Sequence, residues 1–360
     1  MKIGIVTFQE TNNYGAILQN FALQKAIEKH GHVAETVDYR SKYIAKPYRL
    51  SHLKNKGLGK YAFGVVGYLC YMPRTHANKK FRKNINYSKK VKKEQLAELN
   101  NDYDCFITGS DQVWNVNLTG YDDTYFLKFV TDSFKKNSYA ASVGISELDD
   151  KQKEWYADKL SDYHMITVRE KASIGLLKQV TEKEVVDVLD PVFLLTQDEW
   201  KKYVKPVKEK GDYILVYQLG LSTALVNYAK ECAKKYGCKL VFFPFPLVGA
   251  ACGKYKVCGG SGELLSYIAG AKYVITDSFH GTSLSIIFNK KFTTLVSGTH
   301  SAVSSRLTSM LDMLGLSNRI WSGELDLDEE IDYPTVNQLI EVGRNNSEAM
   351  LEKILVREES

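Results

Sequence analysis

The stretch Ile3-Gly4-Ile5-Val6-Thr7-Phe8, together with residues 9–39, has the pattern of a β-α-β unit. The quoted residues are a short apolar run typical of a strand buried in a parallel sheet. Residues 9–15 are polar, and apolar side chains then recur at helical spacing as far as Gly31. Residues 33–39 return as a second strand. Because parallel sheets carry ligand-binding loops at the carboxyl ends of their strands, this unit predicts an α/β fold.

The same alternation continues over the rest of the 360 residues and predicts two Rossmann-like, doubly wound domains facing a cleft. We expect an N-terminal domain over 1–195 with a basic insertion at 40–100, a C-terminal domain over 196–335, and a final helix within 336–360 that packs on either domain. The later strands are expected at 103–108, 138–143, 165–168, 185–189, 213–219, 239–243, 273–276 and 292–296. The later helices are expected at 223–236, 262–270, 282–288 and 336–356.

Composition and missing signatures exclude several classes of protein. Hydrophobic residues make up 44% and charged residues 25%, as in ordinary globular proteins. There is no signal-peptide pattern, and no apolar run approaches the roughly 20 residues that span a bilayer, so we expect a cytoplasmic protein. The sequence lacks the motifs of dinucleotide, P-loop, zinc-protease and hydrolase sites. The last four of the six cysteines are spaced too widely for a zinc knuckle, so we expect neither a metal nor a cofactor.

The loop after the expected strand at 273–276 is the strongest candidate for a functional site. It reads Asp277, Ser278, Phe279, His280, Gly281 and Thr282. Gly281 allows a tight turn, and Thr282 or Ser283 can cap the next helix, whose N-terminus favours an anion such as phosphate. An imidazole beside that anion can donate a proton or stabilise negative charge. His280 can equally serve only to cap or pack the helix.

A second candidate loop follows the expected strand at 103–108. Gly109 frees the turn, Ser110 offers a hydroxyl, and Asp111 is a candidate general base. Trp114 can stack on the face of a sugar ring. An Asx-type turn and a buried tryptophan explain the same residues without any ligand.

Two more segments carry polar groups at strand ends. The first strand-to-helix loop contains Asn12, Asn13 and Tyr14, which suit a polar ligand or, equally, include an asparagine that caps the helix. Arg169 follows the expected strand at 165–168, and its guanidinium matches a carboxylate or a phosphate. Ion pairing of Arg169 with Glu170 at the surface is the alternative.

Taken together, these motifs resemble the polysaccharide pyruvyl transferase family. The resembling segments are residues 12–16, 108–114, 139–142, 168–170, 189–191 and 276–281, which occur in the family's order and cover most of the chain up to about Arg306. The resemblance implies a fold similar to that of GT-B glycosyltransferases, with phosphoenolpyruvate as donor and a free or lipid-linked sugar diol as acceptor. It implies that His280 protonates the enol carbon of the donor. Asp111 would then deprotonate the sugar hydroxyl, and Arg169 would bind the donor.

One position departs from the family's pattern. Relatives carry an arginine two residues before the histidine as a donor ligand, and this sequence has Ser278 there. We therefore expect the donor to be bound by Arg169, by the helix N-terminus after Gly281, or by further basic residues. These further residues are Lys290, Lys291 and Arg306. A glycosyltransferase that uses a nucleotide sugar and a non-catalytic glycan-binding protein are the alternative functions.

The segment from Arg40 to Lys93 contains sixteen Lys or Arg residues and no Asp or Glu. Its apolar run at 61–72 is too short to cross a bilayer but long enough to lie in the interface of an anionic membrane. The alternative is a helical insertion packed on the N-terminal domain with a solvated basic face. We expect no nucleic-acid binding, because the basic run lacks any recognisable reading module.

Overall fold

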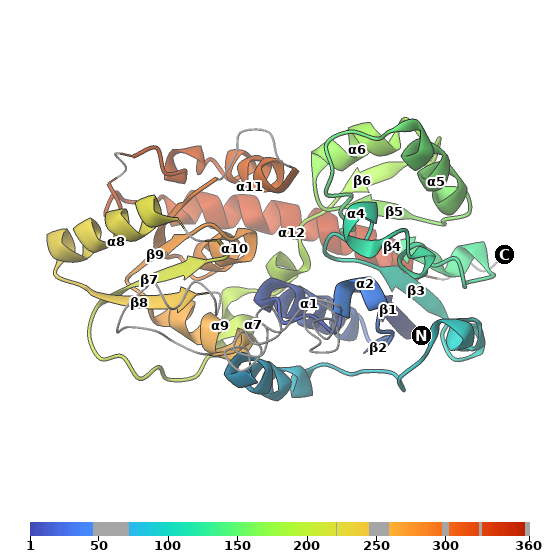
Figure 1. Ribbon diagram of the computed structural model, residues 1–360, viewed down its shortest axis with the longest axis horizontal. Helices are drawn as coiled ribbons and strands as arrows, with labels where there is room; N and C mark the ends of the chain where they lie inside the picture. Colours follow the sequence, from blue (N-terminus) through green and yellow to red (C-terminus); the bar gives the residue numbers. More distant parts are fainter. Residues whose placement is uncertain (46–71, 221, 245–258, 297–301, 324–325, 357–360) are drawn as a thin grey trace, which may run out of the picture.

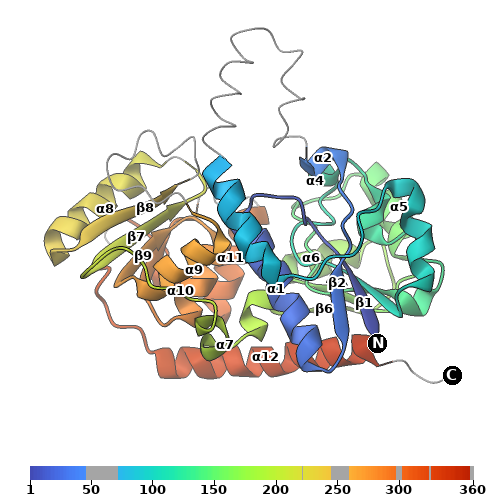
Figure 2. The same cartoon turned by 90° about the horizontal axis from the view of Figure 1, so that it is seen from below.

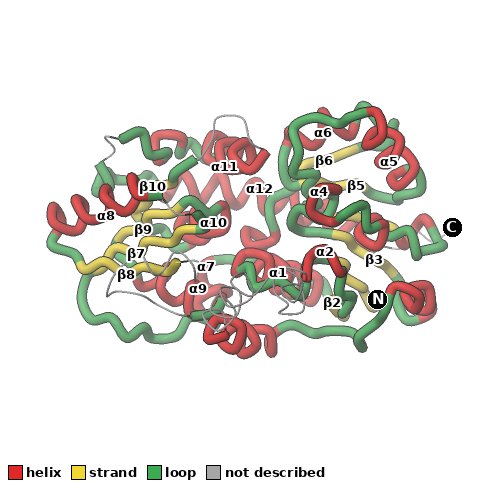
Figure 3. The backbone as a smooth tube through the Cα atoms, viewed as in Figure 1, coloured by secondary structure: helices red, strands yellow, loops and turns green. Residues whose placement is uncertain are grey.

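The computed structural model describes residues 1–45, 72–220, 222–244, 259–296, 302–323 and 326–356. Figure 1 shows two groups of strands side by side, each surrounded by helices, and one long helix that runs behind both. Figure 3 shows the same grouping with strands and helices in different colours. The protein is therefore an α/β protein with two Rossmann-like halves, as the sequence and the GT-B resemblance predict.

The N-terminal sheet is parallel throughout and has the strand order β2-β1-β3-β4. Its strands are β1 (Lys2–Val6), β2 (Val33–Thr36), β3 (Cys105–Thr108) and β4 (Lys136–Ser138). A further parallel pair, β5 (Ile166–Val168) and β6 (Val185–Asp187), adjoins β4 through an isolated bridge between Asn137 and Met165. The strand expected at 138–143 ends at Ser138, because Ala140 takes a left-handed backbone conformation with φ of 50°.

The C-terminal sheet is also parallel and has the order β8-β7-β9-β10. Its strands are β7 (Tyr213–Gln218), β8 (Lys239–Pro244), β9 (Tyr273–Thr276) and β10 (Lys291–Thr294). In each half the first strand of the sheet lies between the second and the third, so the order reverses between β1 and β3 and again between β7 and β9. Ligands of open parallel sheets bind at the carboxyl ends of the strands at such points. The loops after these four strands therefore position the site.

Helices cover both sheets. The α-helices are α1 (Tyr14–Lys29), α2 (Lys42–Ala45), α4 (Val116–Thr119), α5 (Asp150–Leu160), α6 (Lys171–Leu177), α7 (Gln197–Lys201), α8 (Thr223–Tyr236), α9 (Ser261–Gly270), α10 (Phe279–Ile287), α11 (Ala302–Met313) and α12 (Tyr333–Leu355). The connection between the halves includes the 3-10 turn η7 (Pro191–Leu194). Of the helices expected from the sequence, α1, α10 and α12 begin earlier than expected, and α2, α4, α5, α6, α7 and α11 were not expected.

Two helices hold the halves together. The first turns of α12 bury Val336 and Ile340 in the core of the C-terminal half, and its last turns bury Leu351 and Ile354 against the N-terminal sheet. Figure 2 shows this helix running along one side of the whole molecule. The final helix, expected to pack on one domain or the other, thus packs on both. Helix α1 likewise shares its apolar side chains between the cores of both halves.

The described part of the basic segment includes a helix over 72–81 that packs against both halves. Asn12 donates a hydrogen bond to the Thr75 hydroxyl at 2.9 Å, and the Ser261 N–H of α9 donates to the Asn78 side chain at 2.8 Å. The outer side of this helix and of the turn after it exposes lysines. Except for Met72, the apolar run at 61–72 lies outside the described residues. No helix in the described part is long and apolar enough to cross a membrane.

Candidate functional site

His280 lies in the first turn of α10, not in the loop before it. Ser278 is the N-cap of this helix, and its hydroxyl accepts a hydrogen bond from the Gly281 N–H at 3.3 Å. The expected capping by Thr282 or Ser283 is therefore wrong, since the serine before them already satisfies the orphan donor. Gly281 is helical, and a Cβ there would lie 2.6 Å from the Thr276 hydroxyl oxygen. Its role is thus to let α10 approach its own strand closely.

The imidazole of His280 reaches across to the N-terminal half. Its Nε2 atom lies 3.4 Å from Oδ2 of Asp190, just before η7. A Cβ on Gly15, in the first turn of α1, would lie 2.0 Å from Nδ1 of His280. Glycine at position 15 therefore allows the ring to pack directly on the N-terminus of α1. The imidazole thus joins the two halves at the carboxyl ends of their sheets.

Asp190 is a buried carboxylate with several partners. Its Oδ2 atom lies 3.0 Å from Nη1 of Arg169 and accepts a hydrogen bond from the Ser110 hydroxyl at 3.4 Å. Its Oδ1 atom accepts from the Val192 N–H at 3.1 Å. Burial by itself would raise the pKa of Asp190, but His280 first and Arg169 after it hold that pKa well below its ordinary value. Asp190 therefore stays ionised and positions both side chains.

The guanidinium of Arg169 is flanked by two more carboxylates. Nη2 lies 4.0 Å from Oδ1 of Asp111, and Nε lies 3.8 Å from Oε2 of Glu170. Phe279 of the C-terminal half places its ring 5.3 Å from the guanidinium carbon. The pairing with Glu170 considered from the sequence is therefore present, but it is buried and not at the surface, since the Arg169 side chain is only 2% exposed. Arg169 instead lies at the centre of the site.

Arg306 of α11 brings a second buried cation to the same place. Burial, and then the positive charge of Arg169, lower the pKa of Arg306 to about 10, while Glu170 and Asp111 oppose the shift. Arg306 therefore remains charged at neutral pH. It has no ion-pair partner within 4.0 Å among the described residues. A buried, poorly compensated guanidinium is costly unless an anion is bound beside it.

Several polar atoms of this cluster are buried without a hydrogen-bond partner in the described chain. They are Nε and Nη2 of Arg169, Nε of Arg306, Nε2 of His280 and Oε2 of Glu170. Four of these five atoms are nitrogens, so the unmet demand is mainly for an acceptor. Each unsatisfied group costs about 1–3 kcal/mol, which a bound anion or water would offset.

Two helix N-termini from opposite halves strengthen the preference for an anion. Helix α1 begins beside the His280 ring, and α10 begins one residue before it. Neither helix has an acidic residue in its first turn, so their dipoles are not compensated locally. The side chain of Asn13 caps α1 through the N–H groups of Gly15 and Ala16, which is the structural alternative considered for this residue.

Some predicted site residues have structural contacts instead. Trp114 is fully buried, stacks on Phe126 and donates to the Tyr125 carbonyl at 3.1 Å, so it offers no face to a sugar. Tyr14 is buried and donates to the Gly259 carbonyl at 2.9 Å. The side chain of Asn12 is engaged with the helix over 72–81.

Other predicted residues hold the C-terminal half together. Asp277 accepts hydrogen bonds from the Leu219 and Gly220 N–H groups at 2.7 and 3.1 Å. Thr282 donates to the Ser278 carbonyl at 3.0 Å. Lys290 and Lys291 lie at the start of β10, at the end of the sheet opposite His280. The proposed donor contact of these two lysines is therefore wrong.

The structure adds two residues to the site. From the sequence, Asp190 had no role beyond its place in the resembling segment 189–191, and Glu170 was considered only as an ion-pair partner of Arg169. A signal was present in both cases, because each carboxylate follows a short strand of the same two-stranded sheet, β5 being buried throughout and β6 only in part. What the sequence could not show was that these strand ends converge on one arginine.

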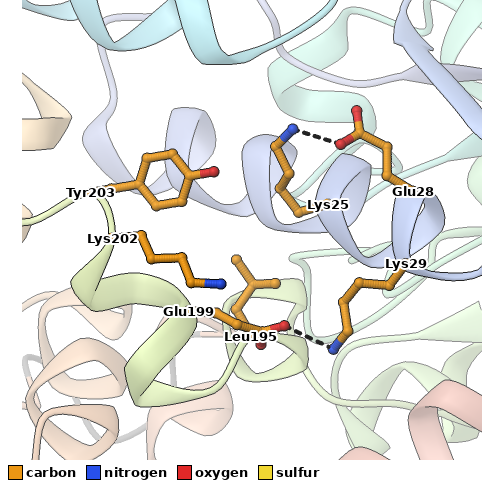
Figure 4. A pocket seen from close by; sticks show the side chains of 7 residues that line it. All are labelled: Lys25, Glu28, Lys29, Leu195, Glu199, Lys202 and Tyr203. Atoms are coloured by element: carbon orange, nitrogen blue, oxygen red, sulfur yellow. Dashed lines mark hydrogen bonds and ion pairs between the residues drawn. The ribbon is translucent and has the colours of Figure 1, made fainter.

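The site is distinct from a charged pocket elsewhere in the molecule. That pocket has a volume of about 280 Å³ and lies between α1 and the segment around α7 (Figure 4). Its lysines are largely neutralised, since Lys25 pairs with Glu28 at 2.5 Å and Lys29 pairs with Glu199 at 3.2 Å. No cluster of metal-binding side chains occurs among the residues that the structure describes.

Comparison with known proteins places the chain in a family. The family model for polysaccharide pyruvyl transferases matches residues 13–298. The chain belongs to the polysaccharide pyruvyl transferase family. Of the site residues, Asp111, Arg169, Glu170, Asp190 and His280 lie within the matched region, and Arg306 lies beyond it. Since this is a transferase family, its members' chemistry is group transfer.

No curated protein sequence matches the chain. Among solved structures, the UDP-GlcNAc 2-epimerase of Methanocaldococcus jannaschii is 13% identical, covers 99% of both chains and has a TM-score of 0.49. Staphylococcus aureus MnaA, solved with UDP, is 11% identical over 94% of this chain and 87% of its own, also at 0.49. Escherichia coli heptosyltransferase WaaC, solved with ADP, is 13% identical over 95% and 100%, at 0.38.

Proposed function

We propose that the protein transfers a pyruvyl group from phosphoenolpyruvate to two hydroxyls of a sugar. The acceptor would belong to a cell-surface polysaccharide or to its lipid-linked precursor. The product is a cyclic pyruvate ketal, and phosphate is released. The family assignment supports group transfer to a polysaccharide, and the site chemistry supports an anionic donor.

The observation that carries this proposal is a set of three buried guanidinium nitrogens, on Arg169 and Arg306, that have no hydrogen bond among the described residues. A donor with a carboxylate and a phosphate supplies acceptor oxygens for all of them. Guanidinium groups bind both anions through paired hydrogen bonds, and the N-termini of α1 and α10 add favourable dipoles. Because the cations come from both halves, the donor would be bound between them.

The residues divide the chemistry as follows. His280 gives a proton to the methylene carbon of the donor, which leaves an oxocarbenium-like centre at the neighbouring carbon. Arg169 and Arg306 bind the donor's anionic groups, with Asp190 as the partner that positions Arg169 and His280. Asp111, 15% exposed at its side chain, accepts a proton from a sugar hydroxyl.

Ser278 does not take over the role of the family's arginine. Its hydroxyl caps α10, and the side chain is 3% exposed. Arg306 enters the same site from a different helix and supplies a second guanidinium. We therefore assign to Arg306 the donor contact that relatives make from the position of Ser278.

Calorimetry with phosphoenolpyruvate tests this assignment. We expect wild type to bind the donor and R306M to bind it at least about 10-fold more weakly, since a charge-assisted contact is worth about 1.5–3 kcal/mol. The control is K291M, because Lys291 lies at the far end of the sheet from the site. R319M would not serve, because Arg319 is buried in the C-terminal half. Wild type that binds a UDP-sugar and not phosphoenolpyruvate would replace this proposal with a nucleotide-sugar glycosyltransferase.

We also propose that the basic segment contacts an anionic membrane. Six exposed lysines on its described part have no ion pair with an acidic residue among the described residues, whereas Lys93 pairs with Asp122 and Asp123; the six are Lys79, Lys80, Lys83, Lys89, Lys90 and Lys92. Met72 is 50% exposed on the same helical face as Lys79. Each lysine near an anionic lipid surface contributes about 1 kcal/mol. A lipid-linked acceptor would then be met at the membrane.

Sedimentation with lipid vesicles tests the membrane contact. We expect wild type to bind phosphatidylglycerol vesicles and not phosphatidylcholine vesicles, and K79E/K80E/K83E to lose this binding. K230E/K234E/K235E on α8 is the control, because these three lysines are equally exposed on another helix. Equal binding by both triple variants would contradict the proposal.

A further inference from the structure

The site contains more carboxylates than an anion-binding site requires. Asp111, Glu170 and Asp190 all lie within 4.0 Å of Arg169, and each negative charge repels an anionic donor. Asp190 is committed to Arg169 and His280. Asp111 lies beside Nη2 of Arg169, and Glu170 lies beside Nε. Two carboxylates that weaken donor binding require another role.

One oxygen of the Glu170 carboxylate accepts hydrogen bonds, and the other has no hydrogen-bond partner among the described residues. Oε1 accepts hydrogen bonds from the Ser142 and Ser173 hydroxyls at 2.8 and 2.6 Å. Oε2 is buried and has no hydrogen-bond partner in the described structure, with Nε of Arg169 at 3.8 Å. Two hydroxyls thus orient the group and leave Oε2 directed at the cluster of cations.

The side chain of Glu170 also does not cap the helix that begins after it. It is the N-cap residue of α6, yet its side chain makes no capping hydrogen bond. A side chain at this position ordinarily stabilises the helix by accepting from the N–H groups of its first turn. Capping of α6 therefore does not explain a glutamate here, and its contact with this helix is the hydrogen bond from the Ser173 hydroxyl to Oε1.

We propose that Glu170 is the proton acceptor for the second sugar hydroxyl, and that Asp111 serves the first. This inference rests on the proposed pyruvyl transfer, in which two C–O bonds form. In the first stage, one hydroxyl oxygen bonds to C2 of the donor, His280 gives its proton to C3, and the hydroxyl proton passes to Asp111. In the second stage, the bond from C2 to the phosphate oxygen breaks and its electron pair leaves with phosphate.

The second hydroxyl oxygen then bonds to C2, and its proton passes to Glu170. Of the two protons held by the carboxylates, one goes to the departing phosphate and the other returns to His280. Donor, acceptor and enzyme are thereby balanced without any further reactant. The two carboxylates beside Arg169 provide one proton acceptor for each hydroxyl.

The variant E170Q separates this role from a structural one. Glutamine has the same shape, and its carbonyl oxygen can still accept from Ser142 and Ser173. With the methyl hexopyranoside that wild type uses best, we expect phosphate release to fall about 100-fold, the lower end for loss of a general base. A covalent adduct of sugar and donor that still carries phosphate should accumulate and be detected by mass spectrometry. D111N should instead reduce formation of that adduct.

Further variants and measurements distinguish a catalytic role of Glu170 from a structural one. E154Q, an exposed glutamate on α5, should behave as wild type. If E170Q proves unstable in thermal unfolding, E170D retains the charge, draws the carboxylate back, and should show the same accumulation more weakly. Phosphate release by E170Q at the wild-type rate would overturn the inference. So would loss of donor binding, since Glu170 would then only position Arg169. Failure of wild type to bind phosphoenolpyruvate refutes the proposed function itself and requires no variant.

Discussion

The loops after β3 and β9 occupy equivalent places in the two halves and perform different tasks. Both strands end in Ile-Thr, and the hydroxyls of Thr108 and Thr276 each donate to a nearby backbone carbonyl, at 2.8 and 2.7 Å. An aspartate follows in both loops. Asp277 uses its carboxylate to hold the loop after β7, whereas Asp111 lies beside Arg169. Equivalent topology therefore does not imply equivalent chemistry.

The backbone shows the same contrast. Asp111 has a φ of 91°, which is unfavourable for any residue with a side chain, and such conformations concentrate at functional sites. The loop after β9 contains no residue with positive φ, and it supplies the site from the helix that follows, through His280. The N-terminal half thus contributes carboxylates and Arg169, and the C-terminal half contributes His280 and Arg306.

The largest effect that this contrast implies is at His280. H280Q should lower phosphate release from phosphoenolpyruvate by about 10²–10⁴-fold, the range for removal of a general acid. Donor affinity should change only a few-fold, because both arginines remain. Steady-state kinetics and calorimetry measure the two quantities. Near-normal turnover in H280Q would contradict the chemical role assigned to the C-terminal half.

The next effect is at Asp190, which links the halves. D190N should lower turnover by about 10-fold or more, as His280 and Arg169 lose their shared partner. It should also lower the free energy of unfolding by about 3–5 kcal/mol at pH 7, the cost of breaking a buried ion pair.

The pH dependence of that stability loss checks its cause. Because the pKa of Asp190 is lowered in the folded state, its stabilising contribution is complete above the unfolded pKa of about 3.9 and is lost as pH falls through the folded value. The difference between wild type and D190N in urea unfolding should therefore shrink below about pH 4. A difference that stays constant down to pH 3 would mean that the charge is not responsible.

Exchanging the two loop aspartates for asparagine sharpens the comparison directly. D111N should slow turnover about 10–100-fold with little change in stability. D277N should lose about 1–3 kcal/mol of stability, since charged hydrogen bonds to two N–H groups are weakened, and should keep most of its turnover. Steady-state kinetics measure the turnover of D111N and D277N, and thermal unfolding measures their stability. The reverse pattern would exchange the roles assigned to the two loops.

The smallest effect on turnover is expected at Trp114. W114F should destabilise the protein by about 1–3 kcal/mol through lost packing and a lost hydrogen bond to the Tyr125 carbonyl. Its Michaelis constant for the acceptor should stay within about two-fold of wild type, because a buried ring cannot contact a sugar. A large rise in that constant would restore the stacking role expected from the sequence.

Periodicity predicted the fold well, because buried parallel strands and amphipathic helices leave strong local patterns. Nine of the ten described strands overlap an expected segment by three residues or more, whereas β4 shares only Ser138 with the expected 138–143 because the chain turns at Ala140. Helix α10 was misplaced, since Ser278-Phe279-His280-Gly281 resembles a loop locally and becomes helical through the Ser278 cap. A local pattern cannot report which of several serines caps a helix.

The site was predicted only in part. His280, Asp111, Arg169 and Arg306 are brought together, as the resemblance implied for three of them. Asp190 and Glu170 were named only within resembling segments or as an ion-pair partner, because their role in the site depends on contacts between strand ends far apart in the sequence. Trp114 and Asp277 were expected to be functional because they follow strand ends. In the structure Trp114 is buried, and Asp277 accepts hydrogen bonds from backbone N–H groups.

The central claim is that guanidinium groups and an imidazole from two halves form one site for phosphoenolpyruvate. Calorimetric titration of wild type with this compound, beside R169M and R306M, tests it most directly. The account predicts 1:1 binding by wild type, and clear weakening in both variants although their arginines lie in different halves. Binding that is absent in wild type, or unchanged in either variant, would contradict it.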